Sequence, residues 1–222
     1  MLLNTILNTA WLAGSAAALS IPAQLQLADT AVDRYDILSK DSDFVFDFNT
    51  ATLPMANRKS FPALVGTNIA LAVNPIDPCS MASLHIHPRS AEIFVVLAGT
   101  IDTEMIPEGG VLTTSSSDGT VTPRVIHTTL HANQTTIFPQ GSFHAQFNNQ
   151  CTPALAVAAF SSDDPGAALV LPQALDQSPD EWVLNSFGEG AVTKEELERF
   201  RAKVPRGAFF DVKECRERCG LA

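Results

Sequence analysis

The sequence predicts an all-β domain, an antiparallel sandwich or barrel, that is followed by C-terminal α-helices. From about residue 44 to about residue 160, short apolar runs alternate with turn-forming stretches such as NPIDPCS, PEGG, SSSDG and NNQ. Hydrophobic residues make up 45% and charged residues 17% of the 222 residues, which suits one sizeable domain with a buried core.

The chain begins with an apolar segment, MLLNTILNTAWLAGSAAALS, in which no side chain is charged. An apolar run followed by small residues is typical of a secretory signal peptide, so we expect residues 1–20 to be a signal, with cleavage after Ala18 or Ser20. A buried first helix of the mature domain is the alternative. The run is short and interrupted by asparagines, and we do not expect it to span a membrane.

Five runs are expected to form strands: FVFDF, ALVGTNIALAV, EIFVVLAGTID, TTIFPQ and ALAVAAF. We expect a β-barrel with an N-terminal extension over residues 21–172. Residues 173–222 then form the helical extension, because TKEELERFRAKV and DVKECRERCG have helical character. Thr193 and Glu196 form a capping box at the start of the first of these helices.

The first C-terminal helix carries an apolar stripe. Leu197, Phe200 and Val204 recur at helical spacing. We expect this stripe to pack against the β domain or against a neighbouring subunit.

Charge and cysteine content limit the class of protein. The formal net charge is −10, and such a surface repels nucleic acids and anionic lipids, so neither is expected as a partner. The four cysteines suit disulfides in a secreted chain, with three pairings open: Cys79, Cys151, Cys215 and Cys219. Zinc binding by Cys215 and Cys219 is a weaker alternative, because no second Cys or His cluster lies near them. A glycosylation sequon at Asn133 adds mild support for secretion.

The stretch HIHPRSAE, residues 85–92, predicts a metal site. His85 and His87 are two apart, so in a strand they face the same side with Cα atoms about 6.6 Å apart. Glu92 has the opposite parity, but Pro88 interrupts the strand. A turn at residues 88–91 could therefore bring the Glu92 carboxylate back to the same ion.

The stretch FPQGSFHAQFNN, residues 138–149, is expected to complete the site. A turn at Pro139 and Gly141 leads into a strand in which His144, Gln146 and Asn148 share one face. His144 would be the fourth ligand. Three histidines and a carboxylate suit Mn, Fe, Ni, Cu or Zn, and they leave coordination positions open for catalysis.

These two stretches resemble the paired motifs of the cupins, H-x-H-x(4)-E with a later glycine (Gly99) and P-x-G-x-x-H-x(3)-N. They are most similar to those of germin-like and spherulin-like proteins. The resemblance implies a single cupin (double-stranded β-helix, jelly-roll) barrel, a divalent metal that is most often manganese, and a homo-oligomer. It also implies that the metal ligands are His85, His87, Glu92 and His144.

The resemblance further implies oxalate oxidase or superoxide dismutase activity as one alternative. In oxalate-oxidising germins an asparagine three residues before the first metal histidine helps to hold the substrate, and here that position is Ala82. A methyl group cannot donate a hydrogen bond to a carboxylate, which disfavours oxalate.

Apolar residues surround the expected ligands, which favours a small-molecule substrate that is medium-sized and mostly apolar. We therefore expect a secreted enzyme of the lyase or cyclase kind, with the metal as Lewis acid in a dehydration or cyclisation of natural-product biosynthesis, as in some fungal relatives. A non-catalytic structural or stress protein is the third alternative. The expected catalytic residues are Gln146 and His127, and an ordinary strand histidine is the alternative for His127. The expected substrate contacts are Met81, Ala82, Phe94, Phe143 and Asn148.

Overall fold

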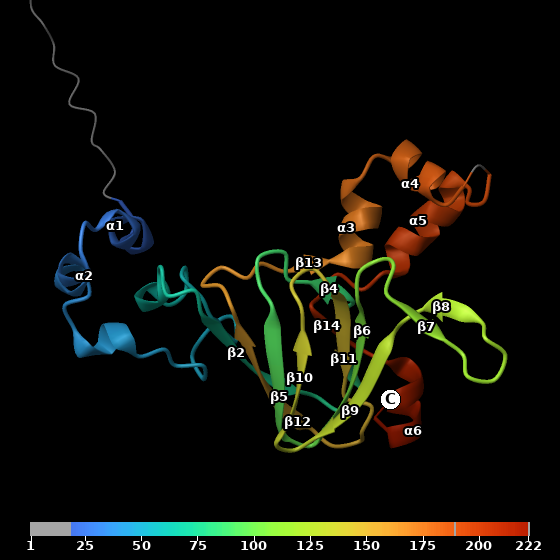
Figure 1. Ribbon diagram of the computed structural model, residues 1–222, viewed down its shortest axis with the longest axis horizontal. Helices are drawn as coiled ribbons and strands as arrows, with labels where there is room; N and C mark the ends of the chain where they lie inside the picture. The colour runs from blue at the N-terminus through green and yellow to red at the C-terminus, as the bar shows by residue number, and fades with distance from the viewer. Residues whose placement is uncertain (1–18, 189, 222) are drawn as a thin grey trace, which may run out of the picture.

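The computed structural model describes residues 19–188 and 190–221, so most of the expected signal peptide lies outside the described residues. Two antiparallel sheets face one another and form a β-barrel (Figure 1). The all-β prediction with C-terminal helices is therefore confirmed. In spatial order, the first sheet contains β1 (Met55–Ala56), β2 (Ala70–Ile76), β12 (Ala154–Phe160), β5 (Glu92–Ala98) and β10 (Gln134–Phe138).

The second sheet contains seven strands, and β6 lies off its main path, where it pairs with β11 on one side and β9 on the other. Strand β11 is central, because it pairs with β6 along one side and with β3 and β4 along the other. The members are β13 (Ala168–Leu169), β4 (His85–Ile86), β11 (Phe143–Phe147), β3 (Ser80–Ala82), β14 (Phe209–Asp211), β6 (Thr100–Ile106) and β9 (Ile126–His131). A separate hairpin, β7 (Leu112–Thr114) and β8 (Val121–Pro123), projects from the barrel between β6 and β9.

The barrel core lies between the sheets and combines small and large side chains. Alanines and phenylalanines of the first sheet meet two large aliphatic side chains of the second sheet, Ile101 on β6 and Leu130 on β9. The buried members are Ala70, Ala72, Ile76, Phe94, Val96, Ile101, Leu130, Phe138, Ala154, Ala156, Ala158 and Phe160.

The N-terminal extension differs from the prediction. FVFDF is not a strand, because Lys40 and the Asp43 side chain form a cap over a 3-10 helix, η1 (Asp41–Phe44), and Asp47 then closes a turn with Asn49. The first half of ALVGTNIALAV is also not a strand, since it contains a second 3-10 helix, η2 (Pro62–Leu64). Helices α1 (Ile21–Leu27) and α2 (Ala31–Ile37) stand to one side of the barrel (Figure 1).

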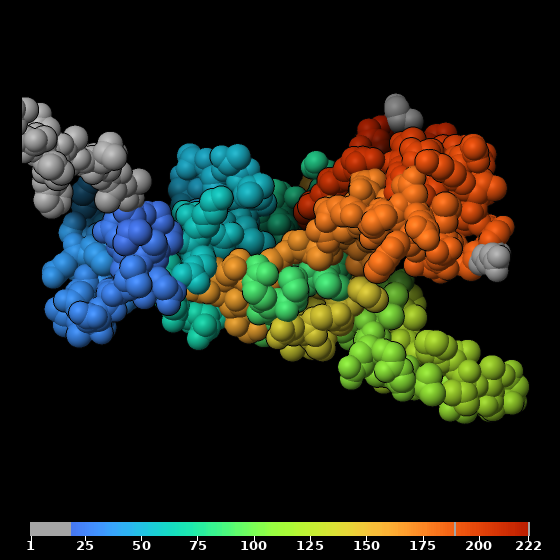
Figure 2. Space-filling model, turned by 90° about the horizontal axis from the view of Figure 1, so that it is seen from above, coloured from blue at the N-terminus to red at the C-terminus, as the bar shows by residue number. Residues whose placement is uncertain are grey.

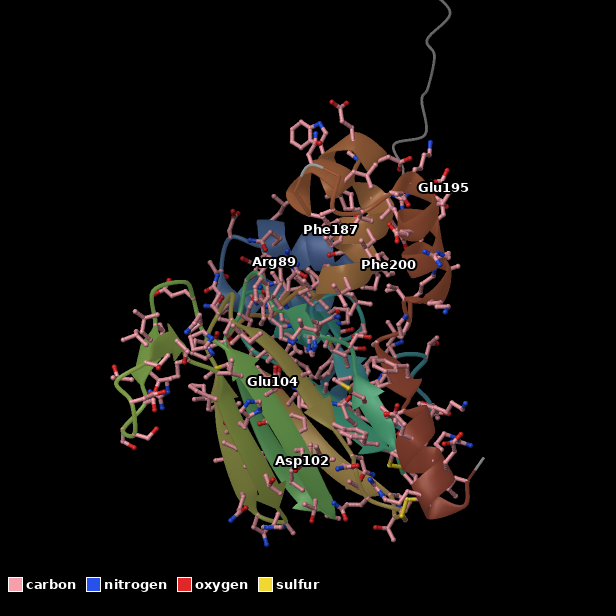
Figure 3. The ribbon with its side chains drawn as sticks, turned by 90° about the vertical axis from the view of Figure 1, so that its right-hand side faces the viewer. Arg89, Asp102, Glu104, Phe187, Glu195 and Phe200 are labelled. Atoms are coloured by element: carbon pink, nitrogen blue, oxygen red, sulfur yellow. A yellow bond between two sulfur atoms is a disulfide. The ribbon has the colours of Figure 1, made fainter. Side chains whose placement is uncertain are left out.

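A helical lobe lies beyond the opposite side of the barrel and consists of α3 (Val170–Gln177), α4 (Asp180–Ser186) and α5 (Lys194–Lys203). The capping box of Thr193 and Glu196 is present as predicted. Leu197 is fully buried, but it packs against Leu175 and Val183 of the lobe itself. Phe200 is exposed (Figure 3), so the apolar stripe packs mainly within the lobe and not against the β domain.

The tail returns from the lobe to the barrel. Strand β14 joins the second sheet beside β3, and α6 (Lys213–Cys219) lies along the outside of the barrel (Figures 1 and 3). Two disulfides attach this tail, Cys79–Cys215 and Cys151–Cys219. This pairing decides among the three possible disulfide pairings, and it leaves Cys215 and Cys219 unavailable as zinc ligands. Disulfides also indicate an oxidising environment. Within the described residues, no helix has the length and apolar character that a membrane span needs.

Candidate metal centre and ligand cavity

Four side chains meet inside the barrel. One ligand atom from each of His85, His87, Glu92 and His144 lies within 4.8 Å of the others. The nearest pair joins His87 Nε2 and Glu92 Oε2, 2.9 Å apart, and His144 Nε2 lies 3.3 Å from the same oxygen. The structure thus brings together all the residues that the sequence predicts as metal ligands.

The strands explain this convergence. His85 on β4 lies directly opposite His144 on β11 in the second sheet. The chain then turns at Pro88, where Ser90 N–H donates to the His87 carbonyl over 3.4 Å, and crosses to the first sheet, where Glu92 begins β5. The parity change between His87 and Glu92 is therefore a change of sheet, and the carboxylate faces the histidines across the barrel.

Each imidazole is oriented by a backbone carbonyl. The Nδ1–H groups of His85, His87 and His144 donate to the carbonyls of Ser83, Gly166 and Ser142 over 2.7, 2.5 and 3.0 Å. A carbonyl only accepts, so Nδ1 must carry the proton and Nε2 presents its lone pair to the centre of the cluster. This tautomer is the one that a metal at the centre requires.

The charges also suit a cation. Burial, followed by the repulsion of His144, lowers the pKa of His85 to about 4, so this imidazole is neutral at neutral pH. Burial alone would raise the pKa of Glu92, but the neighbouring imidazoles of His144 and His87 lower it to about 2. Neutral imidazoles and an ionised carboxylate are the protonation states of metal ligands, and the donor set fits a first-row divalent ion.

A cavity of about 370 Å³ opens from this cluster. Apart from His85, His87 and Glu92, its polar lining is limited to the amides of Asn74 and Gln146. The Gln146 side chain is 5% exposed and makes no hydrogen bond within the described part of the chain. The rest of the lining is apolar: Leu53, Pro54, Met55, Ala72, Ile76, Ala82, Phe94, Ala158, Phe160, Ala167, Leu169, Ala208 and Phe209.

Three of the residues expected at the substrate line this cavity, namely Gln146, Ala82 and Phe94. His127 does not, because on β9 the alternate residues Ile126 and Leu130 face inward. Its side chain is 67% exposed and its Nδ1 lies 3.4 Å from Glu104 Oε2 on the outside of the barrel (Figure 3). The structure therefore does not support His127 as an acid or base at this site.

The other expected contacts also lie elsewhere. Phe143 is exposed on β11, and Met81 lies opposite Phe147 and Phe210, one position from the residues that face the cavity. Asn148 is fully buried, and its amide group donates to the carbonyls of Ile76, Asp77 and Thr152 over 2.9–3.1 Å. Since these backbone groups occupy its donors, Asn148 anchors the loops beside β2 and does not contact a ligand.

Sequence reasoning missed several residues of the site. Phe160 packs edge-on against His87 with ring centroids 4.7 Å apart, and Phe138 stacks on His144 at 4.3 Å. Their strand parity was a usable signal for both. Phe209 carried no such signal, because it reaches the cavity from the C-terminal tail.

Comparison with known proteins agrees with this geometry. The Cupin family model matches residues 37–195. This chain belongs to the cupin family. Its cupin fold is thereby confirmed, and two relatives confirm the likeness to germins and spherulins that the motifs predicted.

Two relatives represent the groups that this cupin resembles. Spherulin-1A of Physarum polycephalum is 30% identical over 221 residues, which cover 95% of this chain and 83% of that protein. Germin-like protein 1 of Brassica napus is 33% identical over 140 residues, covering 59% of this chain and 61% of the relative. A solved structure of oxalate oxidase, 22% identical, superposes with a TM-score of 0.59 over 74% of this cupin and 82% of that chain, which shows a shared fold.

Proposed function

We propose that this cupin is a secreted metal-dependent enzyme that acts on a medium-sized, largely apolar organic molecule, in a dehydration or cyclisation of natural-product biosynthesis. The observation that carries the proposal is the cavity, where a buried His3Glu cluster opens into an almost wholly apolar space. Such a combination suits a ligand with an oxygen at one end and an apolar body. The two disulfides support passage through an oxidising secretory route.

His85, His87, Glu92 and His144 would hold the metal, for which manganese is the first choice and Fe, Ni, Cu or Zn are alternatives. A divalent ion there would supply Lewis acidity to a hydroxyl, phenolate or ketone oxygen. The Gln146 amide would hold a second polar group of the substrate, and the apolar wall would exclude water and restrain the substrate's conformation.

The lining favours this chemistry over oxidation of oxalate. Of the described residues that line the cavity, none is lysine or arginine, and Ala82 offers a methyl group. Apart from the candidate metal ligands, a dianion in this space would meet no cationic side chain and only the Asn74 and Gln146 amides as side-chain donors, which is little compensation for burying a second carboxylate. Apart from His85, His87 and Glu92, no described lining residue has a titratable side chain. The cavity therefore suits a reaction that depends on activating a carbonyl and on the folded conformation of the substrate better than one that needs a separate protein base.

The test uses Mn2+-loaded protein and two kinds of small molecule. We expect 2-hydroxyacetophenone, a neutral hydroxyketone with an apolar ring, to change the Mn2+ electron paramagnetic resonance spectrum. We expect no hydrogen peroxide when oxalate and oxygen are supplied. Peroxide formation would instead establish the oxidoreductase alternative, and a spectrum that responds to neither compound would favour a non-catalytic role.

A further inference from the structure

The C-terminal tail supplies part of the cavity wall. Strand β14 pairs with β3 so that Phe209 lies opposite Ala82 and Phe210 lies opposite Met81. Ala208, Phe209 and Ala82 all line the cavity, whereas Phe210 and Met81 do not. Two adjacent phenylalanines therefore have different environments, since successive side chains of a strand face opposite sides.

The tail is attached closely to the strand that leads into the metal site. Ser83 N–H and Oγ–H donate to the carbonyls of Ala208 and Gly207, each over 2.8 Å. The Ser83 carbonyl in turn accepts from His85 Nδ1. The same residue thus holds both the tail and a metal-site imidazole.

Two covalent bonds make the tail a fixed part of the wall. Val212 N–H donates to the Cys79 carbonyl over 2.9 Å, and the Cys79–Cys215 disulfide follows directly. The Cys151–Cys219 disulfide attaches the far end of α6. These bonds hold β14 against β3, where Phe209 meets the cavity.

Phe209 lies where the cavity opens. Its side chain is 41% exposed, whereas His87 and Glu92 at the inner end are 5% and 3% exposed. Leu53, which is 68% exposed, also lines the cavity. The cavity therefore runs from a buried polar end to an apolar, half-open mouth.

We propose that Phe209 is a specificity-determining residue whose ring forms the apolar wall for the part of the ligand farthest from the His3Glu cluster. The ligand class is a neutral molecule with metal-binding oxygens at one end and an aromatic or branched apolar group at the other. The inference rests on the proposed function in one respect, that the ligand is anchored at the metal.

The test compares two hydroxamic acids on Co2+-loaded protein by visible absorption. Acetohydroxamic acid fills only the inner end, and 2-naphthohydroxamic acid extends toward the mouth. We expect Phe209→Ala to raise the dissociation constant of the naphthyl compound about tenfold, because apolar burial is lost. The dissociation constant of the acetyl compound should change by less than about twofold. Phe209→Leu should recover most of the loss.

Phe210→Ala is the matched control, and it should leave both dissociation constants unchanged. If Phe209→Ala lowered the affinity for both compounds equally, the proposal would be overturned. Such a result would mean that the substitution acts on the metal-site imidazole of His85, through Ser83. An unchanged affinity for the naphthyl compound, or an equal effect of Phe210→Ala, would overturn it as well. Thermal unfolding of each variant identifies any that fails to fold.

A second probe separates this inference from the proposed function. If neither hydroxamic acid alters the Co2+ spectrum of the wild-type protein, metal anchoring fails, and the neutral fluorophore 1-aminoanthracene is then titrated into metal-free protein. We expect about tenfold weaker binding for Phe209→Ala than for Phe210→Ala. Equal binding by the two variants would exclude Phe209 as part of the wall.

Discussion

At the scale of residues, the candidate metal site depends on one carboxylate that faces three imidazoles. Glu92 Oε2 lies within 3.3 Å of both His87 and His144, and each imidazole is oriented through Nδ1 by a backbone carbonyl. The histidines therefore need no side-chain partner to orient them. The anionic member of the described cluster is Glu92, which makes it the residue whose charge matters most.

We predict that Glu92→Gln weakens Mn2+ binding by about 100-fold, because the amide keeps the size of the side chain and removes its negative charge. Titration calorimetry measures the affinity, and elemental analysis measures the metal content. Glu104→Gln is the control, since Glu104 lies on the outside of the barrel (Figure 3). Equal metal content in both variants would contradict the site.

Gly99 in the turn between β5 and β6 is a second residue with a defined constraint. Its φ is +83°, and an added Cβ would lie 2.8 Å from Ala154 Cβ and 3.0 Å from Ala154 Cα. We predict that Gly99→Ala lowers the free energy of unfolding by about 2 kcal/mol more than Gly119→Ala. Gly119 has a similar φ of +72° but open space around it, so urea denaturation of both variants isolates the effect of the clash.

At the scale of elements, the tail shows how distant segments build one wall. Strand β14 and helix α6 follow a helical lobe, yet they pack on the barrel and are covalently attached to it. The Cys151–Cys219 bond closes a loop of 68 residues and the Cys79–Cys215 bond one of 136 residues. Loops of this length restrict the unfolded chain considerably.

We predict that replacing both Cys151 and Cys219 by serine lowers the free energy of unfolding by about 2–4 kcal/mol. Guanidinium denaturation under oxidising conditions measures the change. Reducing agent should lower the wild-type midpoint below that of the oxidised variant, because it also opens the Cys79–Cys215 bond. A variant midpoint equal to that of the oxidised wild type would show that the tail is held by its non-covalent contacts.

At the scale of the whole molecule, the outer face of the first sheet is apolar. Two rows of cross-strand neighbours lie on this face. The first row is Leu71, Ala159, Ile93 and Ile137, and the second is Val73, Val157 and Val95. In the first row, Leu71, Ile93 and Ile137 are 36%, 49% and 54% exposed. Around the barrel, the N-terminal helices, the helical lobe and the β7–β8 hairpin project outward (Figure 2).

We propose that a second copy of this chain covers the apolar rows, in line with the homo-oligomer expected from the family resemblance. Neither row contains a charged residue, so two such faces can meet although the chain has a net charge of −10.

We predict that the wild-type protein is oligomeric by size-exclusion chromatography with light scattering, and that Ile93→Glu produces monomers. Val121→Glu, at a site that is 55% exposed on the β7–β8 hairpin, should not change the mass. A monomeric wild-type protein would contradict the proposed self-association.

The sequence by itself determined the all-β fold, the C-terminal helices and which four side chains meet at the candidate metal site. Spacing and residue type are local properties, and His85, His87, Glu92 and His144 fall in two short motifs whose turns are marked by Pro88 and Gly141. The capping box at Thr193 was equally local, since both of its partners lie within one turn of helix.

Only the tertiary structure decided which side chains reach the cavity. It turned His127 outward, occupied the Asn148 amide with backbone carbonyls, paired the cysteines, and brought Phe209 beside Ala82. The physical reason is that a cavity wall is built from contacts between segments far apart in the chain. Such contacts depend on how the two sheets pack against each other and on where the C-terminal tail meets the barrel. Neither arrangement leaves a periodic signal in the sequence.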